Sequence, residues 1–258
     1  MHRVLTIAGS DSGGGAGIEA DIKTITALGG YAMTSITAVT AQNTVGVFGV
    51  HALPASFVGL SISTVLQDIG ADAIKTGMLA DEAIIRAVSA ALPADIPLVL
   101  DPVMVATSGA ILLPDDAIAA MRVLLVPRAQ LVTPNLPEAA KLTGLKVVSE
   151  DERIEAGRAL LAMGAAAALI KGGHGTGALL TDYLVTREGV EVISMPRIET
   201  RNTHGTGCTM ASAIATGLAQ GMDLSASVHR ARRYLQNAIA TAPGFGAGHG
   251  PVNHLAAG

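Results

Sequence analysis

The sequence predicts an α/β fold in which helices cover both faces of a mainly parallel sheet. Short apolar runs rich in Val, Ile and Leu alternate with longer segments that have helical spacing. Half of the residues are hydrophobic, but aromatic residues make up only 2% and Trp is absent, so the core must be aliphatic. Such runs are typical of parallel strands covered on both faces. No charged or Pro/Ser-rich linker divides residues 1–258, and we expect a single domain.

The first half of the chain alternates expected strands and helices. Val4–Ala8 is a short apolar strand, followed by the glycine-rich loop Gly9–Gly17 and a helix over Ile18–Leu28. A loop at the carboxyl end of a first strand is where open α/β sheets bind ligands. The loop matches neither G-x-x-x-x-G-K-[ST] nor G-x-G-x-x-G. The other expected elements of this half are strands Tyr31–Thr40, Ala71–Thr76 and Leu98–Leu100, and helices Pro54–Ile69 and Ala80–Leu92.

The second half continues the alternation after an aperiodic loop, Val103–Leu113, that we expect to form a wall or lid of a site. Apolar runs predict further strands, the last two antiparallel around a turn, and the final helix carries arginines that we interpret as a solvent-exposed face. The expected strands are Leu131–Thr133, Ala166–Ile170, Ala178–Val185 and Val190–Met195. One expected helix ends at Leu142, and three others span Glu150–Met163, Met210–Gln220 and Leu224–Ala242. The last of these carries Arg230, Arg232 and Arg233.

The charge balance argues against a nucleic acid or a membrane surface as partner. The formal net charge is −4, from 17 basic and 21 acidic residues, and no basic run occurs. Polar residues interrupt the charge-free stretches 24–67 and 202–222, so neither offers the ~20 apolar residues of a membrane span. The single cysteine and an N-terminus that leads directly into a strand pattern favour a cytoplasmic location. We expect a small-molecule substrate.

The segment Asn202–Thr209, called the octet below, combines two glycines, hydroxyl groups and the only cysteine at an expected helix start. Unpaired amides and the helix dipole at such a start favour phosphate or a developing oxyanion. The same field predicts a lowered pKa for the Cys208 thiol, which would make it a proton acceptor. The alternative is an ordinary glycine-rich turn with a buried structural cysteine.

Polar residues near strand ends are further candidate ligand contacts. Gln42 both donates and accepts, which suits an aminopyrimidine or amide edge, although it also fits a turn. Asp21, one helical turn after the glycine-rich loop, either reaches a ligand or stays solvated. Asp101 follows a buried strand and suits Mg²⁺. Lys171 either neutralises a polyphosphate or extends into solvent.

Asn135 and Glu138 stand three residues apart, so they share one side of the first turn of a helix and can face a ligand together. The same pair also fits an N-cap residue and its capping-box partner. Met78, at the end of another strand, is more typical of a core position than of a ligand contact. Both interpretations of the pair stay open at this point.

These residues belong to a series of motifs that occur in a specific order. They are Leu5–Gly17, Thr40–Thr44, Lys75–Met78, Asp101–Met104, Thr133–Ala139, Lys171–His174 and the octet. Each motif alone is weak, but the ordered set resembles the bacterial hydroxymethylpyrimidine and phosphomethylpyrimidine kinases of thiamine biosynthesis. The resemblance runs end to end and implies a ribokinase-like three-layer α/β/α sandwich.

The resemblance also implies an activity and assigns roles to the candidate residues. The implied reaction is Mg²⁺- and ATP-dependent phosphorylation of the pyrimidine hydroxymethyl group, and then of the monophosphate, by a homodimer. The pyrimidine would contact Gly9, Asp21, Gln42, Met78 and Val103, and magnesium would lie near Asp101 and Glu138. The ATP phosphates would contact Asn135, Lys171 and Thr206, and the transferred phosphoryl group would contact Gly205, Thr206, Gly207 and Cys208, the proposed base.

Three alternatives accompany this interpretation. A pyridoxal kinase would use the same scaffold on another small ring that carries a hydroxymethyl group. A ligand-binding module would have kept the fold and lost turnover, but the intact Asp101, Glu138, Lys171 and Cys208 argue against it. A cysteine hydrolase with His204 as base lacks a third residue to orient the histidine.

Overall fold

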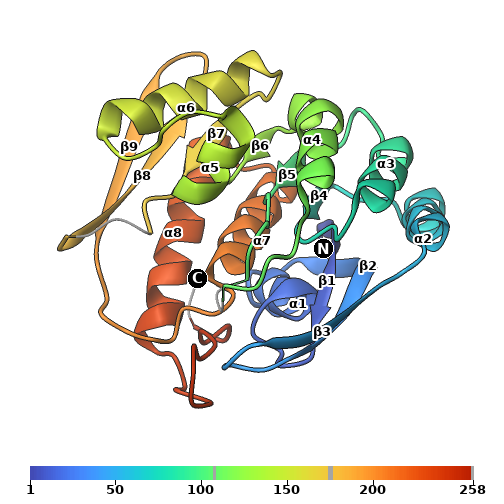
Figure 1. Ribbon diagram of the computed structural model, residues 1–258, viewed down its shortest axis with the longest axis horizontal. Helices are drawn as coiled ribbons and strands as arrows, with labels where there is room; N and C mark the ends of the chain where they lie inside the picture. The colour runs from blue at the N-terminus through green and yellow to red at the C-terminus, as the bar shows by residue number, and fades with distance from the viewer. Residues whose placement is uncertain (107–108, 174–176, 257–258) are drawn as a thin grey trace.

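The computed structural model describes residues 1–106, 109–173 and 177–256, and its centre is a single sheet (Figure 1). Over these residues the sheet has nine strands in the order β3-β2-β1-β4-β5-β6-β7-β8-β9. The strands from β2 to β7 in this order are parallel, whereas β3 at one edge and β8 and β9 at the other are antiparallel to their neighbours. Their bounds are β1 Arg3–Asp11, β2 Tyr31–Gln42, β3 Val47–Ala52, β4 Ala73–Thr76, β5 Leu98–Leu100, β6 Leu131–Val132, β7 Ala168–Ile170, β8 Leu179–Val185 and β9 Val190–Pro196.

Helices cover both faces of this sheet and give three layers. One face carries α2 (Ala55–Asp68), α3 (Glu82–Ala91), α4 (Asp115–Leu124), α5 (Leu136–Thr143) and α6 (Glu150–Ala162). The other carries α1 (Gly17–Ala27), α7 (Thr206–Ala219) and α8 (Leu224–Ala240). In Figure 1 the first group forms the upper arc and the second lies below it. The predicted α/β/α sandwich around a mainly parallel sheet is confirmed.

Two aliphatic clusters hold the layers together, one on each face of the sheet. Successive residues of β1 point to opposite faces, so Val4 belongs to the cluster under α7 and Leu5 to the cluster under α2 and α3. Helix α7 is buried on nearly all sides because its residues are small, and Gly217 lies directly against Ser227 of α8. This packing fixes the start of α7 relative to the strand ends.

The sequence interpretation missed two elements and misplaced one side chain. Neither β3 nor α4 was expected, and a short 3-10 turn, Val126–Arg128, follows α4. The prediction of a solvent-exposed arginine face on α8 is wrong for Arg232, which is 5% exposed. Its guanidinium instead lies 3.3 Å from the Asp182 carboxylate of β8. Among the described helices, none combines the length and the apolar character needed to cross a bilayer.

Candidate active site

The carboxyl ends of the parallel strands open into a cavity of about 650 Å³. Nearly all of the site residues expected from the sequence line it, although they come from seven separate stretches of chain. They are Gly9, Gln42, Met78, Val103, Asp101, Asn135, Glu138, Lys171, Gly205, Thr206, Gly207 and Cys208. The described part of the 103–113 loop contributes to the wall, whereas its residues 107 and 108, and His174 of another motif, lie outside the described residues.

Asp21 is the expected site residue that does not line the cavity. Its side chain has no exposed surface, and its carboxylate accepts hydrogen bonds from Lys75 Nζ at 2.8 and 2.9 Å. The hydroxyl of Ser212 donates at 2.6 Å, and that of Thr6 donates as well. The prediction that Asp21 contacts the substrate is therefore contradicted, because protein donors surround its carboxylate. Burial disfavours the charge on Lys75, but Asp21 outweighs this and raises the pKa of the lysine.

A second lysine–aspartate pair, Lys171 and Asp101, faces the cavity at the ends of β7 and β5. Lys171 Nζ lies 3.0 Å from Asp101 Oδ1, which also accepts from the Thr133 hydroxyl at 3.0 Å. A Cβ on Gly207 would lie 3.4 Å from this Nζ and 3.6 Å from Asp101 Oδ2, so the first turn of α7 covers the pair. Burial opposes the charge of Lys171, but Asp101 and Glu138 raise the pKa of the ammonium group. Lys171 thus places a positive charge at the cavity wall.

Asn135 and Glu138 form the capping box of α5 and also line the cavity. Asn135 Oδ1 accepts from the Glu138 amide at 2.9 Å, and Glu138 Oε2 accepts from the Asn135 amide at 2.8 Å. Burial, followed by the charge of Asp101, raises the pKa of Glu138 to about 7, although Lys171 opposes the shift. The capping interpretation is confirmed, and the Glu138 carboxylate also accepts a backbone hydrogen bond from Met104.

The start of α7 depends on a glycine and leaves backbone donors for a ligand. Gly205 has φ of 80°, and a Cβ there would lie 1.8 Å from the Gly15 carbonyl oxygen, so the octet sits directly on the glycine-rich loop. Thr206 is held by its hydroxyl, which donates to the Thr203 carbonyl at 3.1 Å. The amides of Gly207 and Cys208 donate to no other described residue. They remain available to an anion, as the sequence predicted.

The Cys208 thiol differs from the sequence expectation in its protonation. Desolvation by the surrounding protein raises the pKa of Cys208 to about 11, and Asp21 and Asp101 add to this shift. Lys75 acts in the opposite direction but does not outweigh the desolvation. The prediction of a pKa lowered by the helix dipole is therefore wrong, because burial dominates. The group is a thiol at neutral pH.

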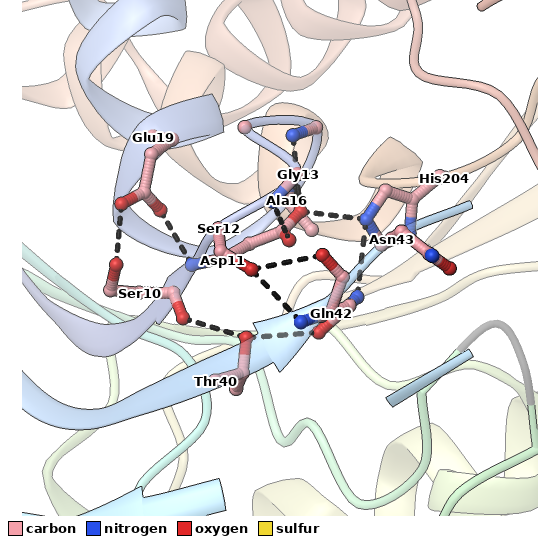
Figure 2. Close-up of polar contacts among 12 residues, drawn as sticks. Ser10, Asp11, Ser12, Gly13, Ala16, Glu19, Thr40, Gln42, Asn43 and His204 are labelled. Atoms are coloured by element: carbon pink, nitrogen blue, oxygen red, sulfur yellow. Dashed lines mark hydrogen bonds and ion pairs between the residues drawn. The ribbon is translucent and has the colours of Figure 1, made fainter. Parts of the chain in front are cut away.

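Figure 2 shows a polar network at the other end of the cavity, centred on Asp11 and His204. His204 Nε2 lies 2.8 Å from Asp11 Oδ2 and 3.3 Å from the amide nitrogen of Gln42. Gln42 Oε1 in turn lies 3.3 Å from the Thr40 hydroxyl. Among the described contacts, the His204 ring meets these groups and not Cys208. The cysteine–histidine pair of a hydrolase is therefore not formed.

Residues 250–254 contact His204 and its neighbour Thr209, and so help to hold this network in place. His204 pairs with Pro251 in a short bridge, and its amide donates to the Gly250 carbonyl at 3.1 Å. His254 Nε2 lies 3.1 Å from the Thr209 hydroxyl, and the Tyr234 hydroxyl donates to the His254 carbonyl at 2.7 Å. Residues 250–254 thus pack against the octet.

Sequence reasoning missed several polar residues that shape the cavity. Asp11 and His204 lie within predicted motifs but received no role in binding, and Asp182 and Arg232 lie in elements interpreted as structural. Asp182 Oδ1 accepts from the Gly172 amide at 2.8 Å and so holds the loop after Lys171. Burial raises the pKa of Asp182 despite the nearby Arg232. A charged residue within a mostly apolar strand, Leu179–Val185, was the available signal.

Comparison with known proteins agrees with this geometry. A family model described as phosphomethylpyrimidine kinase matches residues 11–253. The chain belongs to the phosphomethylpyrimidine kinase family. The hydroxymethylpyrimidine/phosphomethylpyrimidine kinase of Bacillus subtilis is 44% identical over 259 residues, which cover 99% of this chain and 96% of that protein. The family resemblance inferred from the ordered motifs is confirmed.

Other proteins similar to this chain differ from it in length or carry the name of another activity. The thiamine biosynthesis bifunctional protein ThiED of Geobacter sulfurreducens is 49% identical over 98% of this chain, which spans about half (52%) of that protein. A Clostridium difficile phosphomethylpyrimidine kinase structure has a TM-score of 0.82 at 40% identity and covers 93% of this chain and 100% of its own. The ADP complex of Bacillus subtilis pyridoxal kinase has a TM-score of 0.92 at 35% identity and covers 99% and 98%. The shared scaffold therefore serves two named activities.

Proposed function

We propose that the protein transfers a phosphoryl group from ATP to 4-amino-5-hydroxymethyl-2-methylpyrimidine and then to the resulting monophosphate, in thiamine biosynthesis. The observation that carries this proposal is the convergence of the Lys171–Asp101 pair with the free amides of Gly207 and Cys208 in one cavity. Phosphoryl transfer needs positioning and neutralisation of spread negative charge, and these groups provide both. Gln42, at the other end, offers a donor and an acceptor to the ring.

The residues divide the work between the two ends of the cavity. Lys171 holds its positive charge against the phosphates of ATP, with Asn135 and Thr206 as polar contacts. Gly205, Gly207 and Cys208 surround the transferred phosphoryl group, and the amides of Gly207 and Cys208 donate to its oxygens. Gly9, Met78 and Val103 contact the ring, and Gln42 reads its edge. Asp21 has no part in this contact, and it anchors Lys75 beneath the site instead.

Cys208 is proposed to accept the proton of the substrate hydroxyl through its thiolate form. Its pKa of about 11 means that only a small fraction of the protein carries this form at neutral pH. Because catalysis with little base present is slow, the rate should increase with pH. The amides at the start of α7 act independently of this proton transfer.

The carboxylates of Asp101 and Glu138 fit a Mg²⁺ ion bound together with phosphate. Both carboxylates line the cavity, and burial, to which the charge of Asp101 adds, raises the pKa of Glu138 to about 7, so a bound cation would favour its ionised form. No group of three or more His, Cys, Asp or Glu residues that could hold a metal occurs in the described ranges. Mg²⁺ commonly uses one or two carboxylates with waters and substrate phosphates, and it would neutralise charge on the phosphates here.

The test is phosphorylation by purified protein with Mg-ATP and three separate acceptors: the hydroxymethylpyrimidine, its monophosphate and pyridoxal. Mass analysis should identify monophosphate and diphosphate of the pyrimidine. Absence of both products would contradict the proposal. Pyridoxal phosphate as the sole product would favour a pyridoxal kinase, the second candidate, which the structural similarity to that enzyme supports.

We also propose that residues 1–258 form one kinase domain that works as a homodimer in the cytoplasm, without nucleic acid or membrane partners. One continuous sheet supports the single domain. Val45 and, on the edge strand β3, Phe48 and Val50 expose 62%, 73% and 49% of their surface, and a second copy would cover them. Sedimentation analysis of wild type and Phe48→Asp tests the dimer, which the aspartate should dissociate.

A further inference from the structure

The Asp11 carboxylate accepts hydrogen bonds from the backbone on both of its oxygens. Oδ1 accepts from the Gly13 amide at 2.8 Å, and Oδ2 accepts from the amides of Gly15 at 3.0 Å and Ala16 at 2.9 Å. The side chain is only 3% exposed. Although burial opposes ionisation, the contact with His204 and these amides lower the pKa of Asp11. Because an ionised carboxylate only accepts, any polar partner of Oδ2 must donate.

His204 therefore carries a hydrogen on Nε2. Its Nε2 lies 2.8 Å from Asp11 Oδ2, and a bare ring nitrogen there would place two lone pairs against each other. A half turn of the ring would put Cε1 in place of Nε2 against Asp11 Oδ2 and lose this hydrogen bond, so the orientation shown is favoured. The donor direction of this contact is thus fixed from His204 to Asp11.

This direction determines how the Gln42 amide must face. With Gln42 Nε2 at 3.3 Å from His204 Nε2, two N–H groups would oppose each other. A half turn of the amide exchanges its nitrogen and oxygen without moving other atoms. Gln42 Oε1 then shares the single Nε2 hydrogen of His204 with Asp11 Oδ2, as the longer branch of a three-centre bond. Gln42 Nε2 donates to Thr40 Oγ1, which lies 3.3 Å from the amide. The Thr40 hydroxyl has a lone pair to accept with, since its own hydrogen goes to the Ser10 carbonyl at 3.0 Å.

We propose that His204 is a positioning residue that holds the Gln42 amide with its oxygen on the His204 side and its nitrogen on the Thr40 side. Figure 2 shows the three side chains in contact. The inference rests on the proposed function, in which Gln42 reads the ring edge. The outer edge of the amide then offers an acceptor near His204 and a donor near Thr40. An exocyclic amino group beside a ring nitrogen matches this order, with the amino group on the His204 side.

The kinetic test compares the aminopyrimidine with the analogue that lacks the amino group, 5-hydroxymethyl-2-methylpyrimidine. His204→Phe keeps a planar ring but removes the donor, and His204→Gln restores a donor of similar reach. The control is His229→Phe, because His229 pairs with Glu191 at 2.5 Å but does not line the cavity. We expect His204→Phe to reduce the kcat/KM preference for the amino ring about tenfold through KM, the size of one hydrogen bond. His204→Gln should recover the preference, and His229→Phe should keep it.

Two results would overturn the inference. His204→Phe could keep the wild-type kcat/KM preference for the amino ring, or it could lose kcat/KM equally for both rings. A second measurement needs no turnover and no variant. Long-range ¹H–¹⁵N NMR of the wild type should show the proton on His204 Nε2, and an unprotonated Nε2 would contradict the proposal. If the wild type phosphorylates neither ring, the proposed function fails. Calorimetric binding of both rings to wild type and His204→Phe then still decides the role of His204.

Discussion

Two buried lysine–aspartate pairs lie at neighbouring strand ends of this protein, and their surroundings are opposite. Lys75 and Asp21 have no exposed side-chain surface, and Thr6 and Ser212 complete the bonding of the carboxylate. The side chains of Lys171 and Asp101 are 15% and 2% exposed, and the lysine faces the cavity. The first pair is closed by protein on all sides, whereas the second is open on one side.

The comparison shows that residue type does not distinguish a structural ion pair from a binding one. Both pairs bring a lysine and an aspartate to the same end of the sheet. The difference is whether protein groups fill every hydrogen-bonding direction of the two charges. A closed pair stabilises the fold once its desolvation is offset, whereas an open pair keeps the capacity to bind an anion.

The largest effect is expected when one charge of the closed pair is removed. Lys75→Met leaves Asp21 buried without its cation, so the free energy of unfolding should fall by about 3–5 kcal/mol. Urea denaturation measures this loss. The double variant Lys75→Met/Asp21→Leu should recover most of it, because no unpaired charge remains. A single variant as stable as wild type would show that the pair is not closed.

The matching change in the open pair should affect turnover and not stability. Lys171→Met removes the charge proposed to meet the phosphates, and kcat/KM for ATP should fall about 10²–10³-fold. Asp101 keeps the Thr133 hydroxyl and access to the cavity, so the denaturation midpoint should change little. Normal ATP kinetics in this variant would place Lys171 outside the phosphate contact.

Charges from both pairs act on the pKa of Cys208, so the pH dependence of turnover extends the comparison. The thiolate is the form that accepts a proton, and its pKa of about 11 means that this form increases as pH rises towards that value. We expect wild-type kcat to rise with pH in the alkaline range, and Cys208→Ala to lose this rise. The alanine variant should also show kcat lowered about 100-fold at neutral pH while ATP binding persists. Steady-state kinetics and calorimetry measure the two effects, and unchanged turnover would exclude Cys208 as base.

The smallest effect is expected at a third ion pair, which is exposed to solvent. Arg3 Nη2 lies 2.6 Å from Asp72 Oδ1, and this guanidinium lowers the pKa of Asp72 to about 2. A lowered folded pKa contributes stability above the unfolded value, and that stability is lost as pH falls through about 2. Asp72→Asn should barely change stability at neutral pH, since solvent screens such pairs, but should remove part of the acid dependence. Thermal unfolding from pH 7 to acid pH checks this.

The alternation of apolar runs was enough to predict the layers and the end of the sheet that carries the site. Asp101 and Lys171 follow buried strands directly, and a strand end fixes where the next side chain lies. Asp21 could not be judged in this way, because it lies on α1 whereas its partner Lys75 lies on β4, and only the folded structure brings them together. Arg232 was misjudged for the same reason, since Asp182 reaches it from β8.

The elements that escaped prediction also have physical causes. Strand β3 is mostly exposed, so its side chains do not show the apolar alternation of a buried strand. Helix α4 is short and begins after a proline without a side-chain cap, which removes the usual start signal. The protonation of Cys208 depends on how completely the protein covers the thiol, and no local pattern contains that information.

The packing of residues 250–254 against the octet affects the order in which the elements of the fold can form during synthesis. All nine described strands are complete once Pro196 has been added, and α7 follows soon after. The contacts of His204 with Gly250 and Pro251, and of Thr209 with His254, form only after residues 250–254 have been synthesised. A nascent chain therefore has its framework before its phosphate-binding turn is finished, so a chain that has folded through α8 but lacks residues 250–254 should be protease-resistant yet catalytically incomplete.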